Sequence, residues 1–394
     1  MQFLYWLESV RTEFGNWFFS TVTHLGDETA FLLIAILLFW CVNKRSGYFM
    51  MISGFFGTII NQVMKLACKI PRPWVKDPNF TIVESAREAA SGYSFPSGHS
   101  QNGVNTFGAI FLTTKKLWLK ILCVVAAILI PVSRMYLGVH TAWDVLAGAG
   151  CAVIILLLLE EFFKNDNLFK KGMPIIIAVL TAGSIAFFIY AVIATPESSD
   201  PNVISAGKNS RTMLGCSAGL ILVYILDTFV IKFETKASWY SQVMKFVGGI
   251  AVVFAIKELA KIPLTAIMGD NERIVRYFLI VAFAGAVWPL TFKFFAKLDI
   301  PFLNRFADKV GNLFIKKKND EEKAFAEEGE KDKKSFFSEL FSDINNRIRL
   351  KKEKPSQYNE SVIRVNKDYR KAEKQKLARD KARTKKSDTG ADDT

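Results

Sequence analysis

Three short polar clusters interrupt the apolar first half of the chain, and they hold residue types that bind and transfer phosphate. Their members are Lys65 with Arg72-Pro73, then Pro96-Ser97-Gly98-His99, then Ser133-Arg134 with His140 and Asp144. Each cluster lies at the end of an apolar run. Because a charge near a membrane interior is costly, such a position indicates a functional site.

The third cluster contains the candidate nucleophile. His140 and Asp144 are four residues apart, so on a helix their side chains lie on one face. The carboxylate can then accept a hydrogen bond from one ring nitrogen and leave the other with a basic lone pair. A His-x-x-x-Asp pair by itself is more often a structural hydrogen bond, but Arg134, six residues before His140, adds a ligand for an anion.

The second cluster directly precedes an apolar helical run. Ser97 suits the N-cap position, and Gly98 allows the backbone to approach an anion closely. A helix N-terminus offers free N–H groups and the positive end of a dipole, which together bind phosphate. His99 is then expected in the first turn, beside the bound group. The alternative for a single histidine is a structural hydrogen bond at a helix interface.

The first cluster adds two cations. Lys65 lies near the end of an apolar run and Arg72 follows it, directly before Pro73. A single lysine at such a place is usually explained by snorkelling toward the lipid headgroups. Together with Arg134 and a helix that starts at Ser97, however, these cations predict one site that binds phosphate oxygens through charge-assisted hydrogen bonds.

The rest of the chain is predicted to place these clusters in a membrane. The 394 residues are 51% hydrophobic, and nine apolar runs reach or approach the ~20 residues that a helix needs to span a bilayer. They lie near 27–43, 47–66, 97–114, 117–134, 141–160, 173–194, 211–231, 242–262 and 273–296. This pattern predicts an all-α, polytopic membrane helical bundle.

The net charge of +14 does not indicate a nucleic-acid partner, because Lys and Arg fall largely in short loops and in the C-terminal tail. The loops around Lys44, Lys115, Lys170 and Lys232 share one side if the runs alternate, and the positive-inside rule makes that side cytoplasmic. The three clusters are then expected to face outward. The cysteines are scattered and no acidic cluster indicates a metal, so no cofactor is expected.

Four regions are predicted from the composition. Residues 1–26 are expected to form an interfacial amphipathic helix, with a short tilted span as the alternative. Residues 27–165 form the predicted catalytic membrane core, and residues 166–299 the additional transmembrane helices. Residues 300–394 are expected to form a basic, partly disordered cytoplasmic tail. Within it, 335–350 suits a helix on anionic lipid as well as it suits a solvated helix or a coiled-coil partner.

The three clusters together resemble the complete three-part motif of the type 2 phosphatidic acid phosphatase superfamily. The matching positions are Lys65-x6-Arg72-Pro73, Pro96-Ser97-Gly98-His99 and Ser133-Arg134-x5-His140-x3-Asp144. The resemblance covers roughly residues 25–160. It implies a metal-independent phosphatase with a helical core like that of acid phosphatases and vanadate-dependent haloperoxidases.

The resemblance also implies a role for each motif residue. His140 would attack phosphorus, Asp144 would orient His140, and His99 would act as acid and base. The phosphoryl oxygens would be bound by Lys65, Arg72, Ser97, Gly98 and Arg134. No metal ligand is implied, and the bundle after residue 173 has no counterpart in the smallest members of the family.

The expected function is hydrolysis of a lipid phosphate or an isoprenoid diphosphate through a phosphohistidine. An outward site in a bacterial plasma membrane favours undecaprenyl diphosphate as the substrate, with phosphatidylglycerol phosphate, phosphatidate and lysophosphatidate as alternatives. Phosphotransfer to another lipid and a non-catalytic transporter or scaffold are the competing functions. The sequence does not indicate an oligomeric state.

Overall fold

The computed structural model describes residues 1–88, 90, 92–193, 200–298, 300–303, 305, 342 and 349. Within them the chain is helical and contains no strand, so the predicted all-α class is confirmed. Met1–Asp299 form one compact unit and Ile300–Thr394 a second. The predicted tail, with its 335–350 segment, falls almost entirely outside the described residues.

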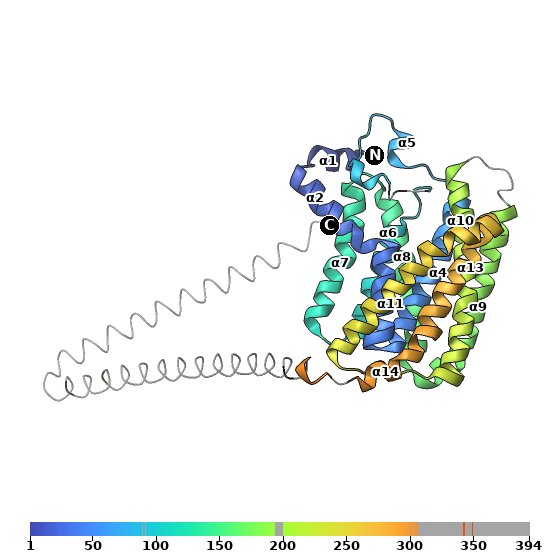
Figure 1. Ribbon diagram of the computed structural model, residues 1–394. Coiled ribbons are helices and arrows are strands. Elements are labelled where there is room, and N and C mark those ends of the chain that lie inside the picture. Colours follow the sequence, from blue (N-terminus) through green and yellow to red (C-terminus); the bar gives the residue numbers. More distant parts are fainter. Residues whose placement is uncertain are drawn as a thin grey trace. The chain divides into compact units, whose positions relative to one another are not determined.

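The first unit is a bundle of long helices joined by short connections, with two small helices at its start (Figure 1). The helices are α1 (Gln2–Ser9), α2 (Glu13–Thr23), α3 (Glu28–Leu37), α4 (Lys44–Cys68), α5 (Pro73–Lys76), α6 (Gly98–Thr113), α7 (Leu117–Tyr136), α8 (Ala142–Lys164), α9 (Asp166–Ile193), α10 (Pro201–Leu226), α11 (Trp239–Leu259), α12 (Lys261–Met268), α13 (Glu272–Ala282) and α14 (Phe292–Lys297). Short π-helical turns continue α3 to Val42, α10 to Ile231 and α13 to Val287.

Capping side chains fix where several of these helices begin. The side chain of Asn43 accepts a hydrogen bond from Ser46 N at the start of α4, and Ser97 accepts one from Ser100 N at the start of α6. Thr141 forms a capping box with Asp144 at the start of α8. Because each cap satisfies a backbone N–H that the helix leaves free, it contributes about 1 kcal/mol to the helix start.

The predicted count of nine spanning runs is corrected by the structure. Every run coincides with a helix, but six stretches of the described chain are long and apolar enough to cross a membrane, or seven if the pair Glu13–Gly26 and Glu28–Val42, bent by 52°, forms one span. The last stretch, Trp239–Lys297, has 59 residues and holds both α11 and α13. Since a span needs about 20 residues, its length suits two passes.

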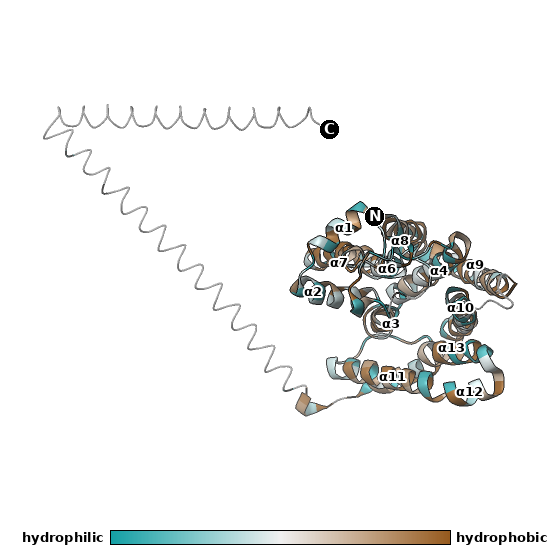
Figure 2. Ribbon diagram, turned by 90° about the horizontal axis from the view of Figure 1, so that it is seen from above, coloured by the Kyte–Doolittle hydropathy of each residue, from teal (hydrophilic) through white to brown (hydrophobic). Residues whose placement is uncertain are grey.

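Helix α6 is the clearest difference from the expectation. It has 16 residues, which is too short for a span. It also buries Gln101, Asn102 and Asn105, so it is too polar to face lipid. It packs against α4, α7 and α8, which surround it in the view along the bundle (Figure 2). An interior helix of this kind can carry the polar groups of a site.

Large apolar side chains cover the outside of the bundle. On α7 the exposed ones are Leu117, Trp118, Ile121, Leu122, Val124, Val125 and Ile128. Helices α8 and α9 expose similar side chains, among them Leu157, Leu158, Ile175 and Val179. Such continuous apolar faces on long helices are what a multi-pass membrane protein presents to lipid.

The N-terminal region is two helices where a single amphipathic helix was expected. The chain breaks at Val10–Thr12, and Thr12 caps α2 by accepting from Gly15 N. Arg11 in the break donates to Tyr136 O and to Thr81 O, each at 2.9 Å. Because one guanidinium holds both the end of α7 and the loop after α5, the break ties this region to that end of the bundle.

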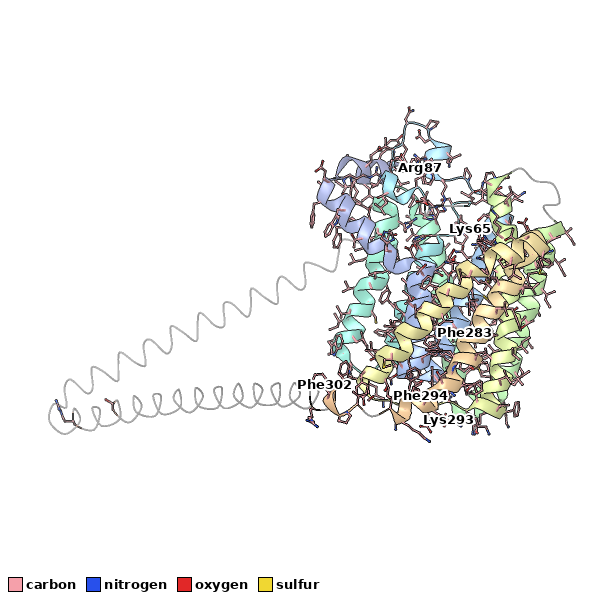
Figure 3. All side chains as sticks on the ribbon, in the orientation of Figure 1. Lys65, Arg87, Phe283, Lys293, Phe294 and Phe302 are labelled. Carbon is pink, nitrogen blue, oxygen red and sulfur yellow. The ribbon has the colours of Figure 1, made fainter. Side chains whose placement is uncertain are left out.

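The two ends of the bundle are chemically different. At one end Lys44 Nζ lies 2.8 Å from Asp227 Oδ1, and Arg45 Nη2 donates to Asn165 O at 2.8 Å, so the α3–α4, α8–α9 and α10–α11 connections meet there. Lys293 and Phe294 lie toward this end, whereas Lys65 and Arg87 lie toward the other (Figure 3).

Candidate active site

The predicted site residues gather at the end of the bundle where α5 lies. Lys65 is in the last turn of α4, Arg72 is the residue before α5, and Arg134 is in the last turn of α7. His140 lies in the turn between α7 and α8. The others are Ser97, Gly98 and His99 at the start of α6 and Asp144 in the first turn of α8.

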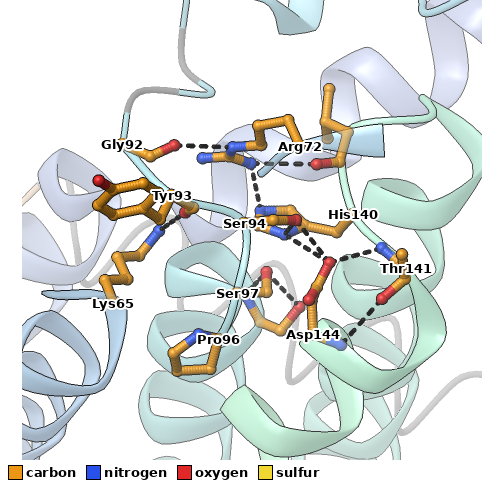
Figure 4. Close-up of polar contacts among 12 residues, drawn as sticks. Lys65, Arg72, Gly92, Tyr93, Ser94, Pro96, Ser97, His140, Thr141 and Asp144 are labelled. Atoms are coloured by element: carbon orange, nitrogen blue, oxygen red, sulfur yellow. Dashed lines mark hydrogen bonds and ion pairs between the residues drawn. The ribbon is translucent and has the colours of Figure 1, made fainter. Parts of the chain in front are cut away.

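His140 is backed by two side chains. Its Nδ1 lies 3.5 Å from Asp144 Oδ2 and 3.5 Å from Ser94 Oγ, and Ser94 donates to the same carboxylate oxygen at 2.6 Å (Figure 4). Thr141 N also donates to Asp144 Oδ2, at 2.7 Å. Asp144 is therefore held by the chain and by Ser94, a residue that the sequence analysis did not identify, and it faces the Nδ1 side of the ring.

The other ring nitrogen of His140 faces Arg72. Arg72 Nη1 lies 2.8 Å from His140 Nε2 and also donates to Val139 O at 3.1 Å, while Arg72 Nε donates to Gly92 O at 3.0 Å. A guanidinium only donates, so Nε2 is the acceptor and the proton of a neutral ring lies on Nδ1. The lone pair that can attack is on Nε2.

The surroundings of His140 keep its imidazole neutral. The ring is 1% exposed, and burial lowers the pKa of His140 well below its usual range, with Arg72, Arg134 and Lys65 acting in the same direction. A neutral imidazole is the nucleophilic form. This histidine would therefore not have to lose a proton before acting as a nucleophile.

Lys65 and Arg134 bring two further buried cations to the site. Lys65 is 7% exposed and donates to Tyr93 O at 2.6 Å. Arg134 is fully buried; its Nη1 donates to Thr23 Oγ1 at 2.8 Å, but its Nε and Nη2 have no hydrogen-bond partner among the described residues. Burying a guanidinium without partners is unfavourable, so this arrangement favours an anionic ligand.

The start of α6 is held against α8. Ser97 N donates to Asp144 O at 2.9 Å, and Ser97 Oγ accepts from Ser100 N. A Cβ added at Gly148 of α8 would lie 2.4 Å from Ser97 O, so only glycine lets the two helices approach so closely. The Ser97 side chain thus acts as the predicted N-cap, and α6 is fixed relative to His140.

Gly98 has no packing reason to be glycine. A Cβ there would meet nothing nearer than Asn61 Oδ1, at 3.9 Å, and Gly98 lines the cleft described next. A side chain at this position would enter the cleft. The glycine therefore leaves the first N–H groups of α6 accessible from the cleft, as anion binding requires.

Several of these groups line one cleft of about 530 Å³. Lys65, Arg72, Gly98, His99 and His140 line it together with the turn before α3. Ser205 and Asn209 of α10 form another part of its wall. The sequence analysis began its apolar run at residue 211, but α10 begins at Pro201, and the polar residues in this earlier stretch face the cleft.

His99 has a carboxylate partner that the sequence did not reveal. Its Nε2 lies 2.7 Å from Asp27 Oδ1, and Asp27 Oδ2 lies 2.8 Å from His24 Nδ1. All three histidines of the protein thus line one cleft. In the part of the chain that the structure describes, no group of three His, Cys, Asp or Glu side chains is arranged to hold a metal ion.

Two family models match the chain. Residues 46–168 match the model described as PAP2 superfamily, and residues 211–299 match the one described as PAP2 superfamily phosphatase, transmembrane extension. The first segment holds every predicted site residue. The two segments together span more than half of the chain.

Curated proteins similar to the chain include enzymes named for lipid phosphates. Phosphatidylglycerophosphatase B of Bacillus subtilis is 28% identical over 177 residues, 41% of this chain and 82% of that protein. An undecaprenyl-diphosphatase of Sulfolobus acidocaldarius is 31% identical over 115 residues, 29% of this chain and 53% of that protein. Sphingosine-1-phosphate phosphatase 1 of Rattus norvegicus is 28% identical over 255 residues, 61% of this chain and 58% of that protein.

The chain therefore spans only about half of the archaeal and rat relatives that it matches. No solved structure gives a significant match.

Proposed function

Because the chain belongs to the PAP2 superfamily, we propose that it is an integral-membrane phosphatase that removes the terminal phosphate from a lipid. The observation that carries this proposal is the position of His140 Nε2, which lies in the cleft beside Arg72 and within reach of two more buried cations. A neutral nucleophile surrounded by excess positive charge suits attack on an anionic phosphorus centre.

The proposed reaction has two displacements. In the first, His140 Nε2 forms a bond to phosphorus, the bond from phosphorus to the lipid oxygen breaks, and His99 gives that oxygen a proton. In the second, His99 takes a proton from water, the water oxygen bonds to phosphorus, and the bond between phosphorus and Nε2 breaks. Asp144 keeps the Nδ1 proton of His140 in place in both steps.

Phosphate binding is assigned to Lys65, Arg72, Arg134 and the start of α6 at Ser97 and Gly98. Since Arg72 donates to His140 Nε2 in this structure, it must turn this donor to a phosphoryl oxygen when substrate binds. The same movement uncovers the nucleophile. Charge-assisted hydrogen bonds from these groups stabilise the charge that develops on the equatorial oxygens.

Undecaprenyl diphosphate is the first substrate that we propose, for an enzyme of a bacterial plasma membrane. Phosphatidylglycerol phosphate, phosphatidate and lysophosphatidate share the same terminal phosphate. The relatives named for phosphatidylglycerophosphate and undecaprenyl diphosphate support this group.

A second candidate is a single-chain sphingoid phosphate. The match to the rat sphingosine-1-phosphate phosphatase covers 255 residues, which is longer than the segment of 46–168 that holds the site. Because the similarity extends beyond the catalytic segment, it favours similar helices around the cleft in the two proteins. Sphingosine 1-phosphate therefore belongs in the same test.

The test is phosphate release by purified protein in detergent, with a chelator present and each of these lipids supplied in turn. Wild type should release phosphate from at least one of them, and His140→Ala should release none. Lys261→Ala, far from the site in sequence and on α12, is the matched control for expression and purification. Release that survives in His140→Ala would rule out the proposed nucleophile, and transfer of the phosphate to another lipid would identify a phosphotransferase.

We further propose four regions: an N-terminal region of 1–26, a catalytic core of 27–165, added helices of 166–299 and a tail of 300–394. The site is proposed to face outward, and the tail is proposed to be cytoplasmic. The basic connections at the end opposite the site support this orientation. Cysteines placed at Asn79 and at Thr384 of a cysteine-free variant should react differently with an impermeant thiol reagent in intact cells. Labelling at 384 without labelling at 79 would reverse the orientation.

A further inference from the structure

We propose that Asp27 is a positioning residue for His99, and that His24 holds the Asp27 carboxylate in place. This inference rests on the proposed function, because it concerns the acid and base of that reaction. The observation that carries it is a carboxylate placed between two rings: Asp27 Oδ1 lies 2.7 Å from His99 Nε2 and Asp27 Oδ2 lies 2.8 Å from His24 Nδ1.

The Asp27 side chain does not cap the helix that follows it. It is the N-cap residue of α3, where an aspartate usually accepts a hydrogen bond from the helix N–H groups. Here its side chain makes no such bond. Both carboxylate oxygens face histidines instead, so the side chain serves a contact between distant parts of the chain and not the helix that it begins.

The backbone also brings this turn close to α6. A Cβ added at Gly26 would lie 2.8 Å from His99 O. Only a residue without a side chain allows this approach, and it places the next residue, Asp27, within reach of the His99 ring. The fold thus keeps the α2–α3 turn against the residue that it is proposed to orient.

The chemistry of the site explains why His99 needs a carboxylate. Burial of His99 and the charges of Arg134 and Arg72 disfavour a protonated imidazole at this position. An acid that protonates a lipid alkoxide must hold a proton there. A carboxylate at Nε2 stabilises the imidazolium, fixes the ring, and directs the second nitrogen, Nδ1, away from itself and toward the reacting group.

The balance of the reaction is unchanged by Asp27. The proton of His99 moves from Nδ1 to the lipid oxygen as that oxygen leaves phosphorus, and Nδ1 later recovers a proton from the attacking water. Asp27 stays ionised throughout. Its loss should therefore weaken both proton transfers and leave the attack by His140 intact.

The experiment compares Asp27→Asn with Glu28→Gln, its matched control. Glu28 is the adjacent carboxylate and lines the same cleft. The substrates are the lipid that wild type hydrolyses best and p-nitrophenyl phosphate, whose nitrophenolate departs without a proton. Phosphohistidine is trapped by an alkaline quench and its amount on the His140 peptide is measured by mass spectrometry.

Asp27→Asn should slow lipid hydrolysis by about tenfold to a hundredfold, a fraction of what a general acid–base residue contributes. The first release of nitrophenolate should stay within about twofold of wild type, and phosphohistidine should accumulate because the second displacement lacks an oriented base. Glu28→Gln should match wild type in all three measurements. His24→Gln, a change at an exposed side chain, should change lipid hydrolysis and phosphohistidine accumulation in the same direction as Asp27→Asn, but by a smaller factor.

Three results would overturn the inference. One is an equal slowing of the first displacement for both substrates by Asp27→Asn; another is a change confined to KM for the lipid, which would make Asp27 a substrate contact; the third is identity with Glu28→Gln. If Asp27→Asn does not fold, equal slowing of the first displacement for both substrates by His24→Gln has the same consequence. A wild-type protein that releases no phosphate from any substrate would instead remove the proposed function.

Discussion

Charged side chains are buried in two regions of this molecule that differ in how the charges are paired. In α13, Arg276 is 4% exposed and Glu272 is 5% exposed. Arg276 Nη2 donates to Glu272 Oε1 at 3.0 Å, and Arg276 Nη1 donates to Lys257 O at 3.0 Å. In the cleft, by contrast, Lys65, Arg72 and Arg134 surround His140, and Asp144 is the nearby carboxylate behind it.

The difference separates charges that hold helices together from charges that bind a ligand. A buried pair of opposite charges leaves little charge for anything else. Lys44 with Asp227 follows the same pattern as Arg276 with Glu272. Around His140, three buried cations share Asp144 and Asp27 as carboxylate neighbours, and a bound anion can balance the remaining charge. Four changes test this contrast, two of them at its centre.

The largest effect is expected for Arg134→Met, which keeps the length of the side chain and removes the charge. Two of the guanidinium nitrogens lack partners in the described chain, so activity should fall about 10²- to 10³-fold, as when one donor to a transition-state oxygen is lost. Thermal stability should stay the same or rise, because an uncompensated buried charge is removed. Phosphate release and thermal unfolding in detergent measure the two quantities; a stability loss with full activity would make Arg134 structural.

The reverse outcome is expected for Arg276→Met. Removing one partner of a buried pair should destabilise the bundle by about 3 kcal/mol, since Glu272 is left buried without its cation. The turnover per folded molecule should not change. Adding Glu272→Leu should recover much of the stability, which identifies the pair as the cause. If Arg276→Met protein remained folded but lost turnover, the added helices of 166–299 would belong to the catalytic machinery.

Much of the site could be predicted from the sequence because its residues lie in short, ordered motifs. His140 and Asp144 lie on neighbouring turns, and Ser97 caps the helix that it precedes. The contact of Asp27 with His99 had no such signal, because nothing in the spacing of residues 27 and 99 links them. Ser94 was missed for a similar reason: it lies in an irregular segment, where periodicity gives no information.

The helices were predictable from apolar runs, and the errors occur where a helix is polar for a reason. Helix α6 was counted as a span, yet its Gln101 and Asn105 are buried in the bundle. The apolar run was begun at residue 211, whereas α10 begins at Pro201 and includes Ser205 and Asn209. In both cases polarity reflects the cleft, which a window of hydropathy cannot distinguish from an aqueous loop.

Gly98→Ala sharpens the comparison at the anion-binding end. The added methyl group meets no protein atom closer than 3.9 Å, so stability should not fall, but the methyl group should displace phosphate from the start of α6. We expect a loss of about tenfold to a hundredfold in kcat/KM, or roughly 1.4–2.7 kcal/mol. Gly150→Ala, with open space around its position in α8, is the matched control. Equal activity of the two variants would show that phosphate does not approach Gly98.

The smallest effect is expected at Tyr93, which links the cleft to α10. Its hydroxyl donates to Asp200 Oδ2 at 2.6 Å, and its carbonyl accepts from Lys65, so one residue joins the phosphate-binding end to the start of α10. Burial and this hydrogen bond raise the pKa of Tyr93 to about 12, which keeps the phenol a donor at neutral pH.

Tyr93→Phe removes this hydrogen bond and leaves the carbonyl that Lys65 uses. The net value of one such bond is about 1 kcal/mol, so kcat/KM should fall about fivefold, through KM, as the cleft wall loosens. Phosphohistidine formation at saturating substrate should be unchanged. Tyr190→Phe, on α9 at a partly exposed position, is the control. A fall of a hundredfold in kcat would mean that α10 takes part in the chemistry, and the distinction between a structural extension and a catalytic core would have to be abandoned.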